Sequence, residues 1–258
     1  MTEKLEGLLH IAIELARKVG KLQLQYFRNP LLKSDTKLNS FDVVTEADKA
    51  SERIIIEELH KLFPTHSILS EESGMTGEEE SEWCWVVDPL DGTTNFKAGL
   101  PVFTVSIALK HWGKNVVGVV FAPYLNEMFT AVLGGGAYLN EKPINVRRNK
   151  DIATMVVATG MPYDKAVNPD NNLENIANVC LKVRGIRRMG TAALDLCYTA
   201  AGYFDAYWEL NLNPWDVSAG MLIVEEAGGV TASIRNNRNQ SIIAGSEEAL
   251  STFRPLIK

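Results

Sequence analysis

Hydrophobic residues recur at helical spacing near the start of the chain. The apolar positions are three or four residues apart and include Leu5, Leu8, Ala12 and Leu15. Because that period places them on one face of a helix, the pattern predicts an amphipathic helix. Asn29-Pro30 marks the point before which it must end.

A second helix has a recognisable start. Thr45 and Asp48 have the spacing of a capping box, with Asp in place of the usual Glu. The predicted helix continues through Ile55 and Leu59, and Pro64 ends it. The polar stretch 33–40, which precedes it, predicts a loop or a hairpin.

The centre of the chain alternates between apolar and polar residues in a way that favours strands. The predicted strands cover residues 67–70, 85–87, 102–109, 116–121, 128–132 and 137–139. Gly134-Gly135-Gly136 joins the last two. No Lys-Ser/Thr follows this glycine run and no helix begins there, so we interpret it as a hairpin turn and not as a phosphate-binding loop.

After Lys150 strands and helices alternate, which predicts an α/β fold. Strands are expected at 154–158, 185–188, 206–208 and 242–244, and helices at 173–181, 191–201, 217–227 and the C-terminus. There is no internal repeat and no low-complexity linker. We therefore expect one domain over residues 1–258, with a soft division into two halves near residues 145–152.

Composition and charge narrow the class of function. The 258 residues include 26 Lys and Arg against 32 Asp and Glu, a net charge of −6, which disfavours nucleic acid as a substrate. The three cysteines show no C-x-x-C spacing, so we expect reduced thiols and a cytoplasmic protein. No apolar run is long enough to suggest a membrane span.

Carboxylates follow apolar stretches that predict strand ends. Asp88 and Asp91 flank Pro89, which fixes φ and excludes a helix, so we expect a tight turn that presents both carboxylates with the Leu90 carbonyl between them. A site made only of oxygen ligands suits Mg²⁺, Mn²⁺ or Ca²⁺ and is poor for zinc. The backbone N–H groups that follow Asp91, in Gly92 and Thr93, would suit a phosphate.

Each acidic motif also has a simpler interpretation. Asp-Pro-x-Asp-Gly is an ordinary turn sequence, Asp216 taken alone is better interpreted as a helix N-cap, and Asp48 suits the first turn of a helix. Glu71 and Glu72 come directly after a predicted strand and weaken the turn interpretation. Several carboxylates that converge without a cation would repel one another.

Several ordered motifs together carry a resemblance to a known family. They are Asp42–Asp48, Glu71-Glu72-Ser73, Asp88–Phe96, Gly190–Ala193, and Trp215-Asp216 followed by Glu225–Gly229. Over nearly its whole length the chain resembles the inositol monophosphatase family of Mg²⁺-dependent, lithium-sensitive sugar phosphatases. The resemblance implies a layered αβαβα sandwich, of the type shared with fructose-1,6-bisphosphatase, and a homodimer.

The resemblance also implies a role for individual positions. The first Mg²⁺ would be held by Glu71, Asp88 and the Leu90 carbonyl, and the second by Asp88, Asp91 and Asp216; Glu71 would share a weaker third ion, and Mn²⁺ could substitute. Glu71 and Thr93 would orient the attacking water, with Asp48 supporting Thr93. The implied substrate contacts are Asp91, Gly92, Thr93, the Ala192 N–H and Glu209. Lys37 and Glu72 would lie just outside these contacts. Without the resemblance, Glu209 would be interpreted as a surface charge.

The function implied is hydrolysis of myo-inositol monophosphate or a similar sugar or polyol phosphate. One alternative is a fructose-1,6-bisphosphatase or a broad sugar or nucleotide phosphatase, with Arg187 and Arg188 available for a second phosphate. The other is a non-catalytic partner of the transcription machinery. It rests on analogy with bacterial relatives, and an acidic chain without a basic tail offers it no support.

Overall fold

The computed structural model describes residues 2–36, 43–78, 80–235 and 239–258. The helices are α1 (Thr2–Tyr26), α2 (Glu46–Leu62), α3 (Thr93–Ala98), α4 (Leu173–Cys180), α5 (Ala192–Ala200), α6 (Pro214–Glu226) and α7 (Glu247–Phe253). Two short 3-10 helices cover Ile152–Thr154 and Arg254–Leu256. None of the helices in these ranges has the length and apolar character needed to cross a membrane.

An eight-stranded sheet occupies the N-terminal half of the chain. Its strands are β3 (Ser67–Ser70), β4 (Gly74–Gly77), β5 (Trp83–Asp91), β6 (Thr104–His111), β7 (Lys114–Ala122), β8 (Glu127–Val132), β9 (Gly136–Leu139) and β10 (Lys142–Pro143). They lie in the order β10-β9-β8-β7-β6-β5-β3-β4, and only the β3–β5 pair is parallel. The Gly134–Gly136 run joins β8 to β9, which pair antiparallel, so the predicted hairpin is confirmed.

A five-stranded sheet occupies the C-terminal half. Its strands are β11 (Val156–Thr159), β12 (Gly185–Arg187), β13 (Ala206–Leu212), β14 (Val230–Arg235) and β15 (Gln240–Gly245), in the order β12-β11-β13-β15-β14. β11 is parallel to both of its neighbours, and the other pairs are antiparallel. A separate two-stranded ribbon pairs β1 (Ser34–Thr36) with β2 (Val43–Thr45).

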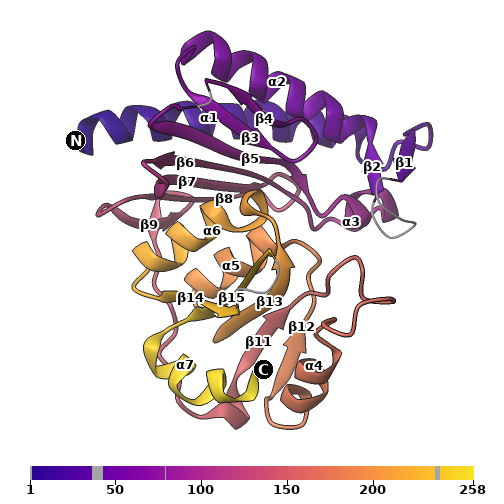
Figure 1. Cartoon of the computed structure of the whole chain (residues 1–258), viewed down its shortest axis with the longest axis vertical. Coiled ribbons are helices and arrows are strands. Elements are labelled where there is room, and N and C mark those ends of the chain that lie inside the picture. Colours follow the sequence, from indigo (N-terminus) through magenta and orange to yellow (C-terminus); the bar gives the residue numbers. More distant parts are fainter. Residues whose placement is uncertain (1, 37–42, 79, 236–238) are drawn as a thin grey trace.

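The elements stack in five layers (Figure 1). Helices α1 and α2 cover one face of the large sheet, α5 and α6 lie between the two sheets, and α4 and α7 lie beyond the small sheet. A buried apolar cluster fills each interface, for example Ile55 with Trp85 beneath the outer helices and Leu196 with Val120 between the sheets. The expected αβαβα sandwich is confirmed.

Most of the predicted elements are confirmed, but β2, β4, β10 and β14 were missed. The capping box of Thr45 and Asp48 opens α2, as expected from the sequence. β4, β10 and β14 are all edge strands. β4 has one large apolar side chain and β10 has only two residues, so neither shows the alternation that reveals a strand. β14 does alternate, with Val230, Ala232 and Ile234 between polar residues, and was missed although the pattern is present.

Candidate active site

A cavity of about 480 Å³ lies between the two sheets, beside the central helices α5 and α6. Its walls come from β3, β5, α5, α6 and β13 and their connections. The acidic and basic residues that line it are Glu71, Asp91, Asp164, Arg188, Asp195, Glu209 and Asp216. Five of them are among the acidic residues of the sequence motifs or adjoin them in space, so this cavity is where the motif chemistry gathers.

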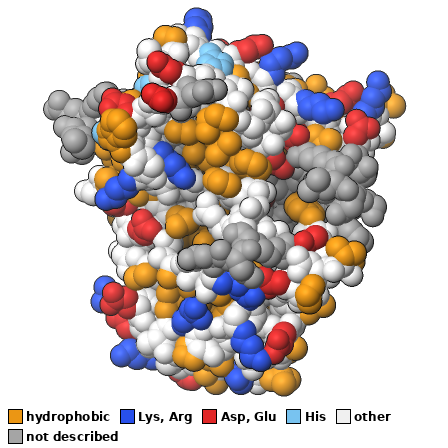
Figure 2. All heavy atoms as spheres, in the orientation of Figure 1, with side chains coloured by type: hydrophobic (Ala, Val, Ile, Leu, Met, Phe, Trp, Pro, Cys, Tyr) orange, Lys and Arg blue, Asp and Glu red, His pale blue; other side chains and the backbone are white. Residues whose placement is uncertain are grey.

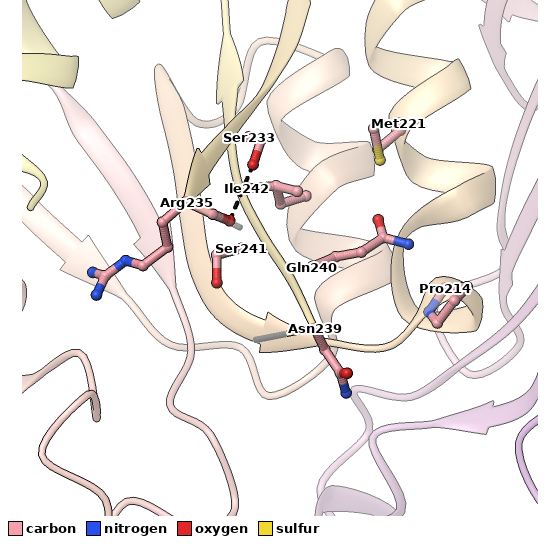
Figure 3. A pocket seen from close by; sticks show the side chains of 8 residues that line it. All are labelled: Pro214, Met221, Ser233, Arg235, Asn239, Gln240, Ser241 and Ile242. Carbon is pink, nitrogen blue, oxygen red and sulfur yellow. Dashed lines mark hydrogen bonds between the residues drawn. The ribbon is translucent and has the colours of Figure 1, made fainter. Parts of the chain in front are cut away.

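A second hollow of about 460 Å³ has a different character (Figure 3). It is lined by Pro214 and Met221 of α6 and by residues of β14 and β15. No carboxylate lines it, and its cation, Arg235, is paired with Asp170 at 2.5 Å. We therefore assign the candidate chemistry to the cavity that holds the carboxylates.

Asp88 and Asp91 lie on one strand at a β-bulge. The expected tight turn is wrong: β5 continues through Pro89 to Asp91, and its register against β6 shifts between Asp88 and Asp91. A bulge tolerates Pro89, which has no N–H to give to a ladder. Asp88 Oδ1 accepts the Leu90 N–H at 3.0 Å, so the bulge turns this carboxylate back toward the Leu90 backbone.

Asp88 is 2% exposed and surrounded by other acids. Burial raises the pKa of Asp88 well above its usual range, and the nearby charges of Glu71, Asp91 and Asp216 raise it further. An ionised Asp88 is therefore strongly unfavourable unless a positive charge joins the cluster.

Asp91, on the large sheet, is hydrogen-bonded to the start of helix α5. Its Oδ2 accepts the Thr191 hydroxyl at 2.5 Å and the Ala193 N–H at 2.9 Å. Burial raises the pKa of Asp91 to about 6, although those two hydrogen bonds and Arg188 favour the charged form. The other oxygen, Oδ1, is thus the one left to face a ligand.

Asp216 reaches the cluster from the first turn of α6. The interpretation of Asp216 as the N-cap is wrong, because the cap residue is Asn213 and Asp216 is the third residue of the helix. Asp216 Oδ2 accepts the Asn213 N–H at 2.7 Å, the reciprocal bond of a capping box. Burial, followed by the charge of Asp91, raises the pKa of Asp216 well above its usual range.

Glu71 follows β3 in a turn whose backbone is held by a residue that the motif analysis did not single out. Glu52 of α2 is 7% exposed, and its carboxylate accepts the hydroxyl of Ser70 at 2.5 Å. It also accepts the Glu72 N–H at 3.1 Å and both the N–H and the hydroxyl of Ser73, at 3.0 and 2.7 Å. The sequence around Glu52 gives no sign of this role, because its partners lie about 20 residues away.

Glu52→Ala is expected to lower the free energy of unfolding by about 3 kcal/mol, since it leaves buried donors without their charged acceptor. For a chain of this size that corresponds to a fall in Tm of about 6–12 °C, measured by calorimetry. Glu57→Ala, an exposed glutamate on the same helix, is the matched control and should change Tm little. Equal melting of the two variants would contradict the assignment.

Thr93 and Asp48 are joined across 45 residues. The Thr93 hydroxyl lies 2.8 Å from Asp48 Oδ1 and 3.0 Å from the Leu90 carbonyl oxygen. The other oxygen of Asp48 accepts the N–H and the hydroxyl of Thr45, at 2.8 and 2.5 Å. One carboxylate thus caps α2 and fixes the orientation of the Thr93 side chain.

Of the expected substrate contacts, Asp91, Ala192 and Glu209 line the cavity, whereas Gly92 and Thr93 are not among its lining residues. Glu209 of β13 lines it and is half-buried, so the interpretation as a surface charge is wrong. Ala192, at the start of α5, lines it as well. Gly92 precedes α3 with φ +91°, and a Cβ there would lie 3.0 Å from the Val102 carbonyl oxygen, so the position requires glycine. Lys37 lies outside the described residues.

Asp195 and Gly160 line the cavity but were missed in the sequence. Asp195 is 1% exposed, and burial, then the charges of Glu209 and Asp91, raises its pKa well above the usual range. In sequence it is one more acid in the first turn of a helix. Gly160 follows a short strand and has no distinguishing neighbour.

The donor set can be tested for its fit to a divalent ion. Among the described residues, no three His, Cys, Asp or Glu side chains are already arranged to hold a metal. The chemistry of the cluster nevertheless suits a hard cation, because its donors are carboxylates and a backbone carbonyl. The charges of Glu71, Asp91 and Asp216 raise the pKa of Asp88, and those of Asp91 and Glu71 raise the pKa of Asp216. A divalent ion would remove that repulsion.

Comparisons with known proteins show the family of the chain. The profile described as "Inositol monophosphatase family" matches residues 4–255. The chain is 44% identical to Nus factor SuhB of Pasteurella multocida (90% of this chain, 87% of that one) and 39% identical to the inositol-1-monophosphatase of Mesorhizobium japonicum (93% and 92%). The solved structure of the extragenic suppressor protein suhB from Bartonella henselae superposes with a TM-score of 0.89, at 41% identity over 98% of this chain and 99% of that one. The chain belongs to the inositol monophosphatase family.

Proposed function

We propose that this protein is a Mg²⁺-dependent phosphomonoesterase that hydrolyses a small polyol or sugar monophosphate, such as myo-inositol monophosphate. The observation that carries the proposal is a group of carboxylates: Asp91, Asp216 and Glu209 line one cavity, and the buried Asp88 interacts with the charges of Asp91 and Asp216. Membership in a phosphatase family that is generally Mg²⁺-dependent supports it.

The residues that would hold the ions are the carboxylates of Glu71, Asp88, Asp91 and Asp216, with the Leu90 carbonyl. Two ions, with a weaker third, agree with the number of acids in the cluster, and Mn²⁺ has the same preference for oxygen ligands. When bound, divalent ions lower the pKa of water and neutralise the charge that develops on the ester oxygens.

The protein side chains orient the attacking water. When the Thr93 hydroxyl donates its proton to Asp48 Oδ1, its oxygen lone pairs remain free to accept a proton of water. Glu71, which lines the cavity and interacts with Asp88, would provide a carboxylate as a second acceptor. Two acceptors on different elements select one orientation of the water, which is the geometric requirement for in-line attack.

The substrate would be held by groups that do not take part in bond cleavage. The N–H groups of Gly92 and Thr93 suit the phosphate, and the Ala192 N–H can donate to a hydroxyl oxygen. Asp91 and Glu209 are acceptors for hydroxyl protons. A ligand with several hydroxyl groups satisfies more of these positions than an aryl ester does, which favours a polyol.

A phosphate-release panel tests the proposal. We expect turnover of inositol 1-phosphate with millimolar Mg²⁺, loss of turnover with EDTA, recovery with Mg²⁺ or Mn²⁺, and inhibition by Li⁺. Turnover that survives complete chelation would refute the metal-dependent mechanism. Turnover of nucleotides far above that of polyol phosphates would refute the substrate class.

A bisphosphate is a second candidate substrate because of Arg188. This side chain is exposed and lines the cavity, and it forms neither a hydrogen bond nor an ion pair with any described residue. An uncommitted guanidinium at the mouth of the cavity suits a second phosphate. If the substrate is fructose 1,6-bisphosphate, Arg188→Gln should raise its KM and leave that of inositol 1-phosphate unchanged.

A non-catalytic role in transcription is a candidate of a different class, because the Pasteurella multocida relative is named as a Nus factor. Figure 2 shows basic and acidic side chains interspersed on the visible face, without the broad basic surface that nucleic acid would favour.

On the basis of the family we also propose a homodimer. Light scattering of the purified chain would test it.

A further inference from the structure

Glu209 is held from one side by a buried tyrosine. Tyr207 and Glu209 are two residues apart on β13, so their side chains lie on the same face of the strand. The Tyr207 hydroxyl donates to Glu209 Oε2 at 2.8 Å. Tyr207 is 0% exposed, and burial, with the nearby charge of Glu209, raises the pKa of its hydroxyl well above the usual range, so it stays a proton donor.

Gly160 lies against the same carboxylate. A Cβ added at Gly160 would be 1.9 Å from Glu209 Oε1, 2.1 Å from its Cδ and 2.2 Å from Oε2. No side-chain atom fits at these distances. The carboxylate of Glu209 therefore occupies the space that any other residue at position 160 would need.

The backbone at Gly160 has little freedom to retreat. Asn172 is 3% exposed, and its Nδ2 donates to the Gly160 carbonyl at 2.7 Å. Asn172 Oδ1 accepts the indole N–H of Trp208, the residue before Glu209, at 2.8 Å. The Thr159 hydroxyl donates to the Trp208 carbonyl at 2.7 Å. Gly160 and Glu209 are thus attached to the same buried network, and a Cβ at position 160 would displace the Glu209 side chain.

We propose that Gly160 and Tyr207 are positioning residues that hold Glu209 in one orientation, and that this orientation selects phosphate esters carrying a free hydroxyl within reach of Glu209. Tyr207 occupies Oε2, and Oε1 is the acceptor that remains for the substrate hydroxyl. The inference rests on the proposed function. It attributes the preference for polyol phosphates, over esters without hydroxyl groups, to the orientation of Glu209.

The test compares a polyol ester, inositol 1-phosphate, with an aryl ester, p-nitrophenyl phosphate. Loss of one hydrogen bond to a charged acceptor is worth about 1.5 kcal/mol, or about tenfold in affinity. Gly160→Ala and Tyr207→Phe are each expected to raise KM for inositol 1-phosphate about tenfold, with kcat changed less than about twofold. Both constants for p-nitrophenyl phosphate should stay within about twofold of wild type.

A double-mutant cycle decides whether the effect passes through Glu209. In the Glu209→Ala background, neither Gly160→Ala nor Tyr207→Phe should raise KM further. A further increase of the same size in that background would overturn the inference. So would an equal loss of activity on both esters. Tyr207→Phe removes a single oxygen, so the cycle remains decisive if Gly160→Ala fails to fold.

Two controls match these variants. Gly185 lies on β12, and a Cβ there would meet only the end of the Arg187 side chain, at 3.0 Å. Tyr198 donates its hydroxyl to Glu127, away from the cavity. Gly185→Ala and Tyr198→Phe should leave KM for both esters unchanged. A wild-type protein inactive on both esters would refute the proposed function itself. If the wild type is active but the effects of the variants on KM add to that of Glu209→Ala, only the positioning role is refuted.

Discussion

Asp88→Asn is expected to lower kcat for phosphate release by at least about 10²–10³-fold, the loss typical of removing one preorganised electrostatic group. The carboxylate is central to the cluster, and the amide that replaces it has the same shape but no charge to offer a cation. The amide oxygen can still accept the Leu90 N–H that Asp88 accepts at 3.0 Å, so the bulge in β5 should be kept. Single-turnover and steady-state phosphate release measure the change.

Asp205→Asn is the matched control for this substitution. Asp205 is buried like Asp88, but its carboxylate accepts the Val156 N–H at 2.8 Å and a proton of Asn149 at 3.1 Å, outside the cavity. It should change Tm more than kcat. Asp88→Asn activity within tenfold of wild type would contradict the assigned cluster. A cell that keeps its normal phenotype with an inactive Asp88→Asn protein would support the non-catalytic role instead.

Chelation is expected to destabilise the protein, and more at pH 8 than at pH 5.5. In the metal-free protein, the pKa values of Asp88 and Asp216 are raised, that of Asp91 is raised to about 6 and that of Glu209 to about 7. The folded state then binds protons more tightly than the unfolded chain, so its stability falls as pH rises from about 4 through about 7. Mg²⁺ binds the deprotonated carboxylates and opposes this loss.

The size of the effect follows from linkage. Mg²⁺ at a hundredfold excess over its Kd adds about 2.7 kcal/mol, or about 5–11 °C in Tm for a chain of this length. Differential scanning calorimetry with EDTA or Mg²⁺ at both pH values measures it. In Asp88→Asn the response to Mg²⁺ should shrink and the metal-free protein should melt higher at pH 8, whereas Glu57→Gln should behave as wild type. An equal response to Mg²⁺ at both pH values would contradict the linkage.

Elements with their own periodicity could be predicted from the sequence. The spacing of Leu5, Leu8 and Ala12 reveals α1, and Thr45 with Asp48 reveals the start of α2, because these signals lie within one or two helical turns. β4 has four residues with one large apolar side chain and lacks such a signal. β14 carries one, because Val230, Ala232 and Ile234 alternate with polar residues, and it was missed although the pattern is present.

The part of the site made by residues that are close in sequence could be predicted. Asp88 and Asp91 follow a buried strand in sequence and lie together in the structure. The proposed role of Asp216 as a metal ligand could not be found in the same way, because a carboxylate at the start of a helix usually serves the helix, as Asp216 does when it accepts the Asn213 N–H. Only the family resemblance indicated the second role.

Contacts between distant segments could not be read from the chain at all. Gly160 and Glu209 are 49 residues apart, and nothing near either residue indicates that one leaves room for the other. The hydrogen bonds of Glu52 to the turn after β3 are of the same kind. Such pairs are set by how the layers pack, which a local pattern does not specify.

The side chains at the cavity come from both halves of the layered structure. The eight-stranded sheet supplies Asp88 and Asp91, whereas the five-stranded sheet and its connections supply Glu209, Gly160 and Arg188. Mutations in the second group therefore leave the carboxylates of Asp88 and Asp91 themselves in place. A duplicated copy of this gene could acquire a new substrate through a few changes in the smaller sheet, with its hydrolytic machinery inherited intact.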